Sequence, residues 1–203
     1  MIHDFWAAAK VRDPRLLWED VRKWKLDLKG AYTLLSFRPE DVGLFAMLLT
    51  GDNMVYFQLA GSSGWSGTPA AFQVVTRAIT WELRHALQSS TVMYVDDIIG
   101  VCFADALELD LAIARAICTN LLGPGAVTDD KTEHGVRLDV IGYTLDLTQE
   151  RVLIARKNFL TALHGFISTD VTQRLNLKAV QRLASWERGM GRYAASCVPF
   201  VGR

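Results

Sequence analysis

Cysteine is scarce in this chain, and its few copies do not pair at short spacing. The three cysteines, Cys102, Cys118 and Cys197, include no CxxC pair, which indicates buried thiols in a reducing compartment and argues against a disulfide framework. The four histidines form no HExxH motif and no mixed Cys/His ligand spacing. These two observations together argue against a zinc site.

Long hydrophobic runs and low-complexity stretches are also missing. No apolar run approaches the length of a membrane span, and the first residues, MIHDFWAAAKVRDP, carry an acid before any apolar run, unlike a signal peptide. Half of the 203 residues are hydrophobic and 22% are charged, and the length is enough for one domain with a sizeable core, or for a domain plus a small appendage. We expect an intracellular protein, cytoplasmic or nuclear, with no membrane partner.

The net charge is zero, but the charge is unevenly distributed. Residues 1–150 contain 13 basic and 20 acidic side chains, a net charge of −7, whereas residues 151–203 contain 9 basic and 2 acidic ones, a net charge of +7. A basic C-terminal segment could bind phosphates. Taken alone, the same segment could equally be an ordinary solvated helical surface.

Hydrophobic periodicity predicts a mixed α+β fold. We expect two short helices in residues 5–23, a strand opening at 26–28, hairpins at 45–59 and 91–103, and a strand pair at 138–147. Helices are predicted from Pro69 to about Leu87, with Thr68 as N-cap, and over 105–122, 156–167 and 176–190. This order is typical of an antiparallel sheet backed by helices.

Two adjacent acids stand at the turn of the second predicted hairpin. Asp96 and Asp97 lie between TVMYV and IIGVCF, two strands that should both be buried, and Asp27 lies between Leu26 and Leu28 on another. Buried carboxylates are costly unless they are paired or bind a metal, although an exposed acidic turn is the ordinary alternative. The three acids could hold two Mg²⁺ ions for an in-line phosphoryl displacement, with Mn²⁺ as a substitute.

Several segments around these acids resemble conserved motifs of reverse transcriptases. Tyr94–Asp97 (YVDD) resembles their YxDD box, Asp27–Tyr32 (DLKGAY) their first palm motif, and Gly64–Gln73 (GWSGTPAAFQ) their GWxGSPAxFQ motif. Lys131 and the Ile141–Tyr143 (IGY) segment are similar to their triphosphate lysine and primer grip. The GWSGTPAAFQ and VDDI sequences look most like DIRS-type or gypsy-type retrotransposons.

The resemblance implies a polymerase palm with three parts. Residues 1–24 would be a helical lead-in or incomplete fingers, 25–150 a palm with a fingers hairpin near 43–60, and 151–203 the basic helical start of a thumb. The expected activity is RNA-directed DNA polymerisation, a nucleotidyl transfer from dNTPs to a primer 3′-hydroxyl on an RNA or DNA template. The expected partners also include other domains of a retroelement polyprotein.

The resemblance also implies a role for each motif residue. Asp27 and Asp96 would hold the metal ions, with Asp97 a weaker ligand or electrostatic partner, and Lys131 would place a cation or proton at the leaving pyrophosphate. The nucleotide would contact Lys29, Gly30, Ala31, Tyr32, Gly67 and Pro69, with Tyr32 excluding a 2′-hydroxyl. The template and primer would contact Trp65, Gly142, Tyr143, Lys178 and Arg182.

The sequence departs from the family pattern in three places. Ser63 stands where many reverse transcriptases carry Gln or Phe, a basic fingers segment is not recognisable in residues 1–24, and no RNase H acidic set follows. We therefore expect a fragment, or an element copy that lacks part of its fingers. Two alternatives stay open: an RNA-dependent RNA polymerase, against which Val95 and Tyr32 argue, and an inactive remnant that only binds nucleic acid or a partner.

Overall fold

The computed structural model describes residues 2–49, 51, 53–87 and 89–168. Contacts within the chain divide it into two compact units. The first comprises the residues before Trp6 together with 24–133, and the second comprises residues 6–23 together with the chain from His134 onward. Within the described residues, no helix is both long and apolar enough to cross a membrane.

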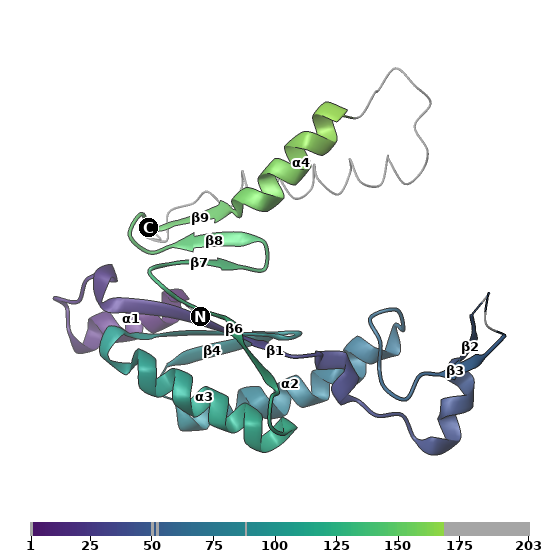
Figure 1. Ribbon diagram of the computed structural model, residues 1–203. Coiled ribbons are helices and arrows are strands. Elements are labelled where there is room, and N and C mark those ends of the chain that lie inside the picture. The colour runs from purple at the N-terminus through teal and green to yellow at the C-terminus, as the bar shows by residue number, and fades with distance from the viewer. Residues whose placement is uncertain (1, 50, 52, 88, 169–203) are drawn as a thin grey trace. The chain divides into compact units, whose positions relative to one another are not determined.

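A four-stranded sheet forms the centre of the first unit (Figure 1). Its strands, in spatial order, are β4 (Ser90–Tyr94), β5 (Asp97–Phe103), β1 (Val21–Leu28) and β6 (Val127–Gly135). The backbone N–H of Leu28 donates to Asp96 O at 2.9 Å, and that of Lys29 donates to Ala126 O at 2.8 Å. The end of β1 therefore lies beside the start of both neighbouring strands, as in an antiparallel sheet.

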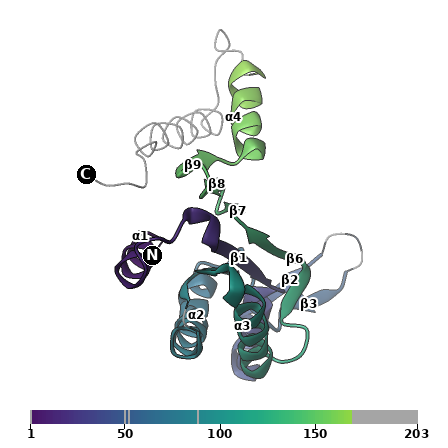
Figure 2. The same cartoon turned by 90° about the vertical axis from the view of Figure 1, so that its left-hand side faces the viewer.

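Two helices, α2 (Gly67–Ala86) and α3 (Leu107–Leu122), lie side by side against one face of this sheet (Figure 2). Alternate residues of β1 point toward them, because successive strand residues face opposite sides. The buried core combines these residues with matching positions of β5, α2 and α3: Trp24, Leu26, Leu28, Ile98, Cys102, Phe72, Ile79, Leu83, Leu107, Leu111, Ala114 and Cys118. The predicted α+β class and the predicted apolar periodicity of the long helix are confirmed.

The start of α2 differs from the prediction. The helix begins at Gly67, preceded by Ser66, which makes no side-chain capping hydrogen bond. Thr68 is not the N-cap residue, because its side chain is buried inside the first turn. The Thr-Pro pair was interpreted as an N-cap residue followed by Pro at N1. A helix that begins two residues earlier, at Gly67, contains the same pair within its first turn.

The predicted first hairpin is present as a small two-stranded sheet. Strands β2 (Ala46–Leu48) and β3 (Val55–Phe57) are antiparallel, with Ala46 opposite Phe57. A 3₁₀ helix, Pro39–Phe45, precedes them. Every residue of both strands is exposed.

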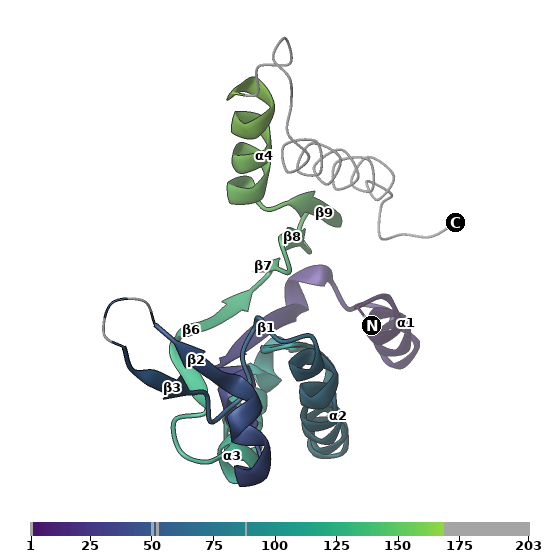
Figure 3. The ribbon, with the colours of Figure 1, turned by 90° about the vertical axis from the view of Figure 1, so that its right-hand side faces the viewer.

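The second unit contains a three-stranded antiparallel sheet and a helix (Figure 3). The elements are β7 (Arg137–Val140), β8 (Tyr143–Asp146), β9 (Arg151–Ile154) and α4 (Arg156–Ser168). The predicted strand pair at 138–147 and the predicted helix at 156–167 are confirmed. The predicted helix at 176–190, with Lys178 and Arg182, lies outside the described residues.

The secondary structure differs from the prediction in three further places. The two helices predicted in residues 5–23 are one helix, α1 (Ile2–Arg12), and a 3₁₀ turn, Trp18–Asp20. The LDL segment ends β1 instead of opening it, since the strand already begins at Val21. The prediction started too late because the alternating residues Val21, Lys23 and Lys25 were not recognised as part of the strand. Strand β6 was not predicted, since its sequence VTDDKTEHG is mostly polar, as befits an edge strand.

Candidate functional site

Asp27 lies near the end of β1, one residue before the strand stops. The residue is only 8% exposed. Strand alternation sends Trp24, Leu26 and Leu28 into the helix-covered core, so Asp27 must point to the opposite face of the sheet. Its carboxylate is therefore held by a rigid central strand and not by a loop.

Asp96 lies in the two-residue connection between β4 and β5. Tyr94 pairs with Asp97 across the hairpin, which leaves Val95 and Asp96 as the turn. Val95 has a positive φ of 54° and Asp96 does not, a pattern that corresponds to a type II′ turn, in which glycine is usual at the first position. A β-branched residue in this conformation stores strain of about 1–3 kcal/mol.

The chain reverses directly after Asp27 through an exposed turn. Gly30 adopts a left-handed conformation, with φ 61° and ψ 40°, and starts a 3₁₀ helix, Ala31–Leu34. A Cβ at this position would lie 2.6 Å from the Thr33 hydroxyl oxygen, which itself donates to Gly30 O at 2.7 Å. Glycine therefore satisfies both the backbone angle and the close approach of Thr33.

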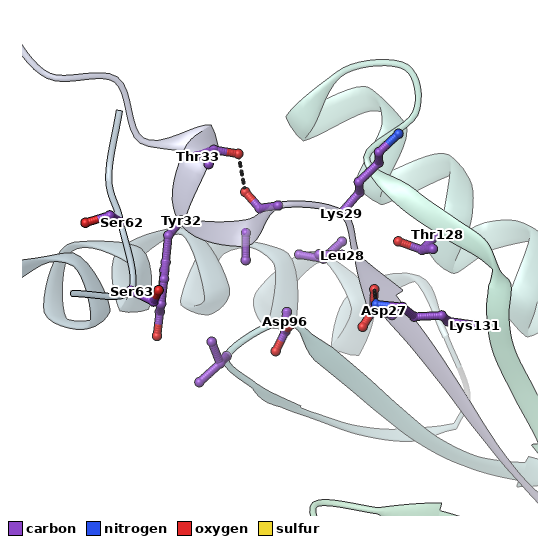
Figure 4. Close-up of a pocket in the computed structure, with 13 residues that line it drawn as sticks. Asp27, Leu28, Lys29, Tyr32, Thr33, Ser62, Ser63, Asp96, Thr128 and Lys131 are labelled. Atoms are coloured by element: carbon purple, nitrogen blue, oxygen red, sulfur yellow. Dashed lines mark hydrogen bonds and ion pairs between the residues drawn. The ribbon is translucent and has the colours of Figure 1, made fainter. Parts of the chain in front are cut away.

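These segments line one open pocket of about 680 Å³ (Figure 4). Its walls bring together the end of β1, the following turn, the β4–β5 turn, a serine pair and the start of β6. The lining residues are Asp27, Leu28, Lys29, Gly30, Ala31, Tyr32, Thr33, Ser62, Ser63, Val95, Asp96, Thr128 and Lys131. Two carboxylates from neighbouring strands thus face the same space.

Lys131 also reaches this pocket, from the unpredicted edge strand β6. Its Nζ lies 3.1 Å from Asp27 Oδ2 and donates a hydrogen bond to it. This hydrogen bond, together with the charges of Asp27 and Asp96, raises the pKa of Lys131 above its ordinary value. The lysine is therefore a cation at neutral pH, and it pairs with Asp27 on the inner strand β1.

Asp97 is the first residue of β5 and does not line the pocket. Strand alternation places it on the same face of the sheet as Asp27, since Ile98 points into the core. Burial raises the pKa of Asp97, and the charges of Asp96 and Asp27 add to this, while Lys25 and Lys131 oppose it. Lys25, which the motif comparison did not single out, is therefore part of the electrostatics of this site.

The side chains that the structure describes do not form a three-ligand metal site as they stand. Within the described part of the chain, no group of three or more His, Cys, Asp or Glu side chains is arranged to hold a metal ion. The available donors are the hard carboxylate oxygens of Asp27 and Asp96, the ligand type that Mg²⁺ prefers. These two carboxylates fit Mg²⁺ in the type of their donor atoms.

Tyr32 lines both this pocket and a second one of about 230 Å³. The smaller pocket is lined by Tyr32, Pro69, Phe72, Gln73, Thr76, Met93, Tyr94 and Val95. The ring of Tyr32 meets Phe72 edge to face, with centroids 5.8 Å apart. Because Phe72 is only 1% exposed, this contact fixes the tyrosine against the core while leaving it partly open to both pockets.

Three predicted site residues of the GWSGTPAAFQ segment lie outside the larger pocket. Trp65 packs edge to face against Phe37 and Phe45, with centroids 5.5 and 5.2 Å away, and is 42% exposed. Gly67 lies under this ring, since a Cβ there would come within 2.5 Å of Trp65. Pro69 lines only the smaller pocket.

Gly142 and Tyr143 belong to the second unit. Ile141 and Gly142 connect β7 to β8, and both have positive φ, 49° and 82°, which corresponds to a type I′ turn. The carbonyl of Gly142 accepts from Ala155 N at 3.0 Å and from Asn158 Nδ2 at 3.4 Å. The turn is thus held against the start of α4.

The same unit contains a buried lysine that the sequence reasoning missed. Lys23 is fully buried, and its ammonium donates to the carbonyl of Leu145. Burial lowers the pKa of Lys23 to about 8, against the opposing charge of Asp146. The only sequence signal for the burial of Lys23 was its position in the alternating VRKWKLDL strand.

Comparisons with known proteins give a similarity of fold. No protein-family model and no curated protein matches the chain. A foamy viral protease-reverse transcriptase in complex with an RNA/DNA hybrid matches with a TM-score of 0.61 and 15% identity, over 83% of this chain and 21% of that chain.

Two further structures of the foamy viral protease-reverse transcriptase, in complex with double-stranded DNA, match similarly. Their TM-scores are 0.63 and 0.57, with 14% and 15% identity, over 83% of this chain and 27% and 32% of those chains. The chain thus spans less than a third of the length of these proteins. The fold of the chain is reverse transcriptase-like.

Proposed function

We propose that this chain is the polymerase palm region of a retroelement reverse transcriptase, an RNA-directed DNA polymerase. One observation carries the proposal. Asp27 and Asp96, from neighbouring strands, face one pocket beside an exposed backbone turn and a lysine, on a fold similar to the foamy viral enzyme. Two carboxylates and a cation around an open pocket suit the binding and transfer of a phosphate chain.

Asp27 and Asp96 would hold Mg²⁺ in this proposal. The bound ions would supply the positive charge that stabilises both oxygens of an in-line displacement. Asp27 contributes a carboxylate that its strand already orients, so little ordering is needed on binding. Asp97, close by on the same face, adds negative charge to the site without lining the pocket.

Lys131 would have two roles in turn. Before substrate binds, its ammonium neutralises Asp27, which offsets the cost of a mostly buried carboxylate. With a triphosphate in the pocket, the same exposed side chain could leave Asp27 and donate a hydrogen bond to a phosphate oxygen. Because phosphate oxygens are negatively charged, they would favour the protonated lysine as Asp27 does, so its ammonium is suited to stabilising the leaving pyrophosphate.

The turn after β1 would bind the nucleotide. Lys29–Thr33 presents its backbone to the pocket, and Gly30 leaves no side chain to block the approach of phosphates. Tyr32 would close the sugar side and fill the space of a 2′-hydroxyl. Trp65 would contact the template, and the Ile141–Tyr143 turn of the second unit would contact the primer, in keeping with the nucleic acids bound by the foamy viral enzyme.

Primer extension on an RNA template tests this proposal. We expect Mg²⁺-dependent synthesis that Asp27→Asn and Asp96→Asn each reduce by at least about a hundredfold, because an amide cannot supply the charge that holds the metal. Asp105→Asn is the matched control, since Asp105 is exposed and lies at the other end of β5. Equal activity of Asp96→Asn and the control would reject the assignment.

Tyr32 provides a second test, for the choice of sugar. Tyr32→Ala should leave the metal ligands in place and admit ribonucleotides, so that the ratio of kcat/KM for dNTP over rNTP falls by roughly a hundredfold. Phe72→Leu is a control that removes the aromatic ring against which Tyr32 packs and leaves Tyr32 itself in place. If truncation leaves the ratio unchanged, Tyr32 is only a core aromatic, and the argument for DNA synthesis over RNA synthesis is lost.

A remnant that binds nucleic acid without catalysis is the second candidate. The ion pair between Lys131 and Asp27 and the lack of a three-ligand group among the described residues favour it. Binding of Mn²⁺, measured by electron paramagnetic resonance, distinguishes the two. A polymerase should bind Mn²⁺ with an affinity that Asp27→Asn lowers, whereas a remnant should bind a template-primer duplex but show no such dependence.

A further inference from the structure

Strand β6 carries Lys131 to the site, although the strand contributes little to the core. Each residue of β6 is partly or fully exposed, and the strand lies at an edge of the sheet, beside β1. The Lys131 side chain is 61% exposed where it reaches Asp27 (Figure 4). An exposed lysine has many rotamers, and burial does little to fix the register of this edge strand. The position of Lys131 opposite Asp27 therefore depends on other contacts of β6.

Arg115 of α3 contacts β6 on both sides of Lys131 in the sequence. Its Nη1 atom forms an ion pair with the carboxylate of Asp129, and its Nη2 atom donates a hydrogen bond to Thr132 Oγ1 at 2.9 Å. Asp129 precedes the lysine and Thr132 follows it directly. Because a guanidinium is planar and rigid, it constrains the relative positions of its two partners. A single side chain thus fixes the short part of β6 that carries Lys131.

Arg115 itself extends from a well-packed helix. Leu111 and Cys118, about one helical turn before and after it, are buried in the core, as is its neighbour Ala114. Residues three and four positions apart are neighbours on a helix surface, so Arg115 lies at the border of the buried face of α3. The helix therefore gives the arginine a fixed base from which its side chain can orient an edge strand.

The other ion pair of β6 provides less constraint. Lys25 Nζ lies 3.9 Å from Glu133 Oε1, and the glutamate side chain is 51% exposed. A lysine ammonium acts as a point charge and lacks the directional preference of a guanidinium. Arg115, with two partners on β6, is therefore better placed than Lys25 to set the position of Lys131.

We propose that Arg115 is a positioning residue for Lys131, holding the lysine within reach of the substrate phosphates by fixing β6 against α3. This inference rests on the proposed function, in which Lys131 stabilises the leaving pyrophosphate. Arg115 does not line the pocket and acts through β6 alone. The Asp129 side chain is 77% exposed, so this ion pair contributes little to global stability. Its effect is on the local geometry of the strand.

A double-mutant cycle in primer extension tests this role. Arg115→Ala should lower kcat by about fivefold and change the KM for dNTP by less than about twofold, because a displaced lysine loses a contact that strengthens in the transition state. In a Lys131→Ala background, Arg115→Ala should cause no further loss of kcat, since its effect passes through that lysine. Arg84→Ala, at an exposed arginine of α2, is the matched control and should keep the wild-type kcat. Equal losses from Arg115→Ala in both backgrounds would overturn the proposal.

Amide hydrogen exchange of the 203-residue chain provides a second readout, which needs no activity. Arg115→Ala should speed exchange in residues 128–133, whereas Arg84→Ala should leave it at the wild-type rate. Thr132→Val removes one of the two contacts without altering α3, so it should speed exchange in the same residues to a smaller extent. Wild-type exchange of residues 128–133 in Arg115→Ala would contradict the proposal. If the wild-type chain extends no primer, the proposed function fails, and the exchange rates still decide whether Arg115 fixes β6.

Discussion

The two hairpins of the first unit differ sharply in what surrounds them. In β4–β5 most residues of the second strand are buried, and two helices cover one face of the sheet to which it belongs. In β2–β3 all six strand residues are exposed, including Met47, Leu48, Val55, Tyr56 and Phe57. Both sequences are strongly apolar, so hydrophobicity alone does not distinguish a buried hairpin from an exposed one.

The difference also explains where chemistry can be built. A two-stranded hairpin is marginally stable by itself, so its turn cannot hold side chains to within a fraction of an ångström. The β4–β5 turn is anchored by the Leu28 N–H to Asp96 O hydrogen bond and by the core beneath it. It can therefore keep Val95 in a strained conformation and present Asp96 to the pocket.

The largest expected effect comes from a glycine in each hairpin. Gly100→Ala would place a methyl group 2.1 Å from the Trp24 ring and should lower the free energy of unfolding by about 3 kcal/mol or more. Gly51→Ala meets no atom within 4 Å, so only its φ of 133° opposes the substitution, at a cost of about 1 kcal/mol. Urea unfolding of both variants measures the difference, and equal midpoints would refute it.

Charge burial provides the next contrast, between two lysines. The pKa of Lys23 is lowered to about 8 from 10.5, so between these values the unfolded chain binds more protons and stability rises with pH. Across this pH window we expect the free energy of unfolding to rise by at most about 3 kcal/mol. The Lys23→Met variant should show no such rise. Lys157→Met, at an exposed site, should keep the wild-type pH profile of thermal unfolding.

The two hairpin turns can be compared through their positive-φ residues. Val95→Gly should raise the free energy of unfolding by about 1 kcal/mol, because it releases strain at a β-branched residue. Asn53 has a φ of 53° in the other hairpin, and asparagine is tolerated in this left-handed region better than a β-branched residue. Asn53→Gly should therefore change the free energy of unfolding by less than about 0.5 kcal/mol. Similar gains in both variants would show that Val95 is not strained.

The smallest effect is expected on the exposed hairpin strands. Leu48→Ser replaces a side chain that is 64% exposed, and should change the free energy of unfolding by less than about 0.5 kcal/mol. Ile98→Ser, at a fully buried position of β5, should cost several kcal/mol. A large loss from Leu48→Ser would mean that the hairpin is covered in solution.

Local patterns predicted most elements of the first unit. The 3.6-residue spacing of Phe72, Ile79 and Leu83 identified α2, and two apolar runs around an acidic turn identified β4–β5. The polar strand β6 escaped prediction because an edge strand does not need alternating apolar residues. The resemblance pointed to Lys131 as a site residue, but the sequence did not place it on a strand; the structure puts it on β6, where it pairs with Asp27.

The sequence by itself determined which side chains could perform chemistry: three acids on or beside apolar strands, a glycine after the first and an aromatic five residues beyond it. Only the tertiary structure decided their neighbours. The pairing of β5 with β1, and of β1 with β6, joins residues about 70 and 100 positions apart, and no local periodicity encodes such a pairing. It also placed Asp27 and Asp96 in one pocket, and it put Asp97 outside the lining although strand alternation gives Asp97 the same helix-free face as Asp27.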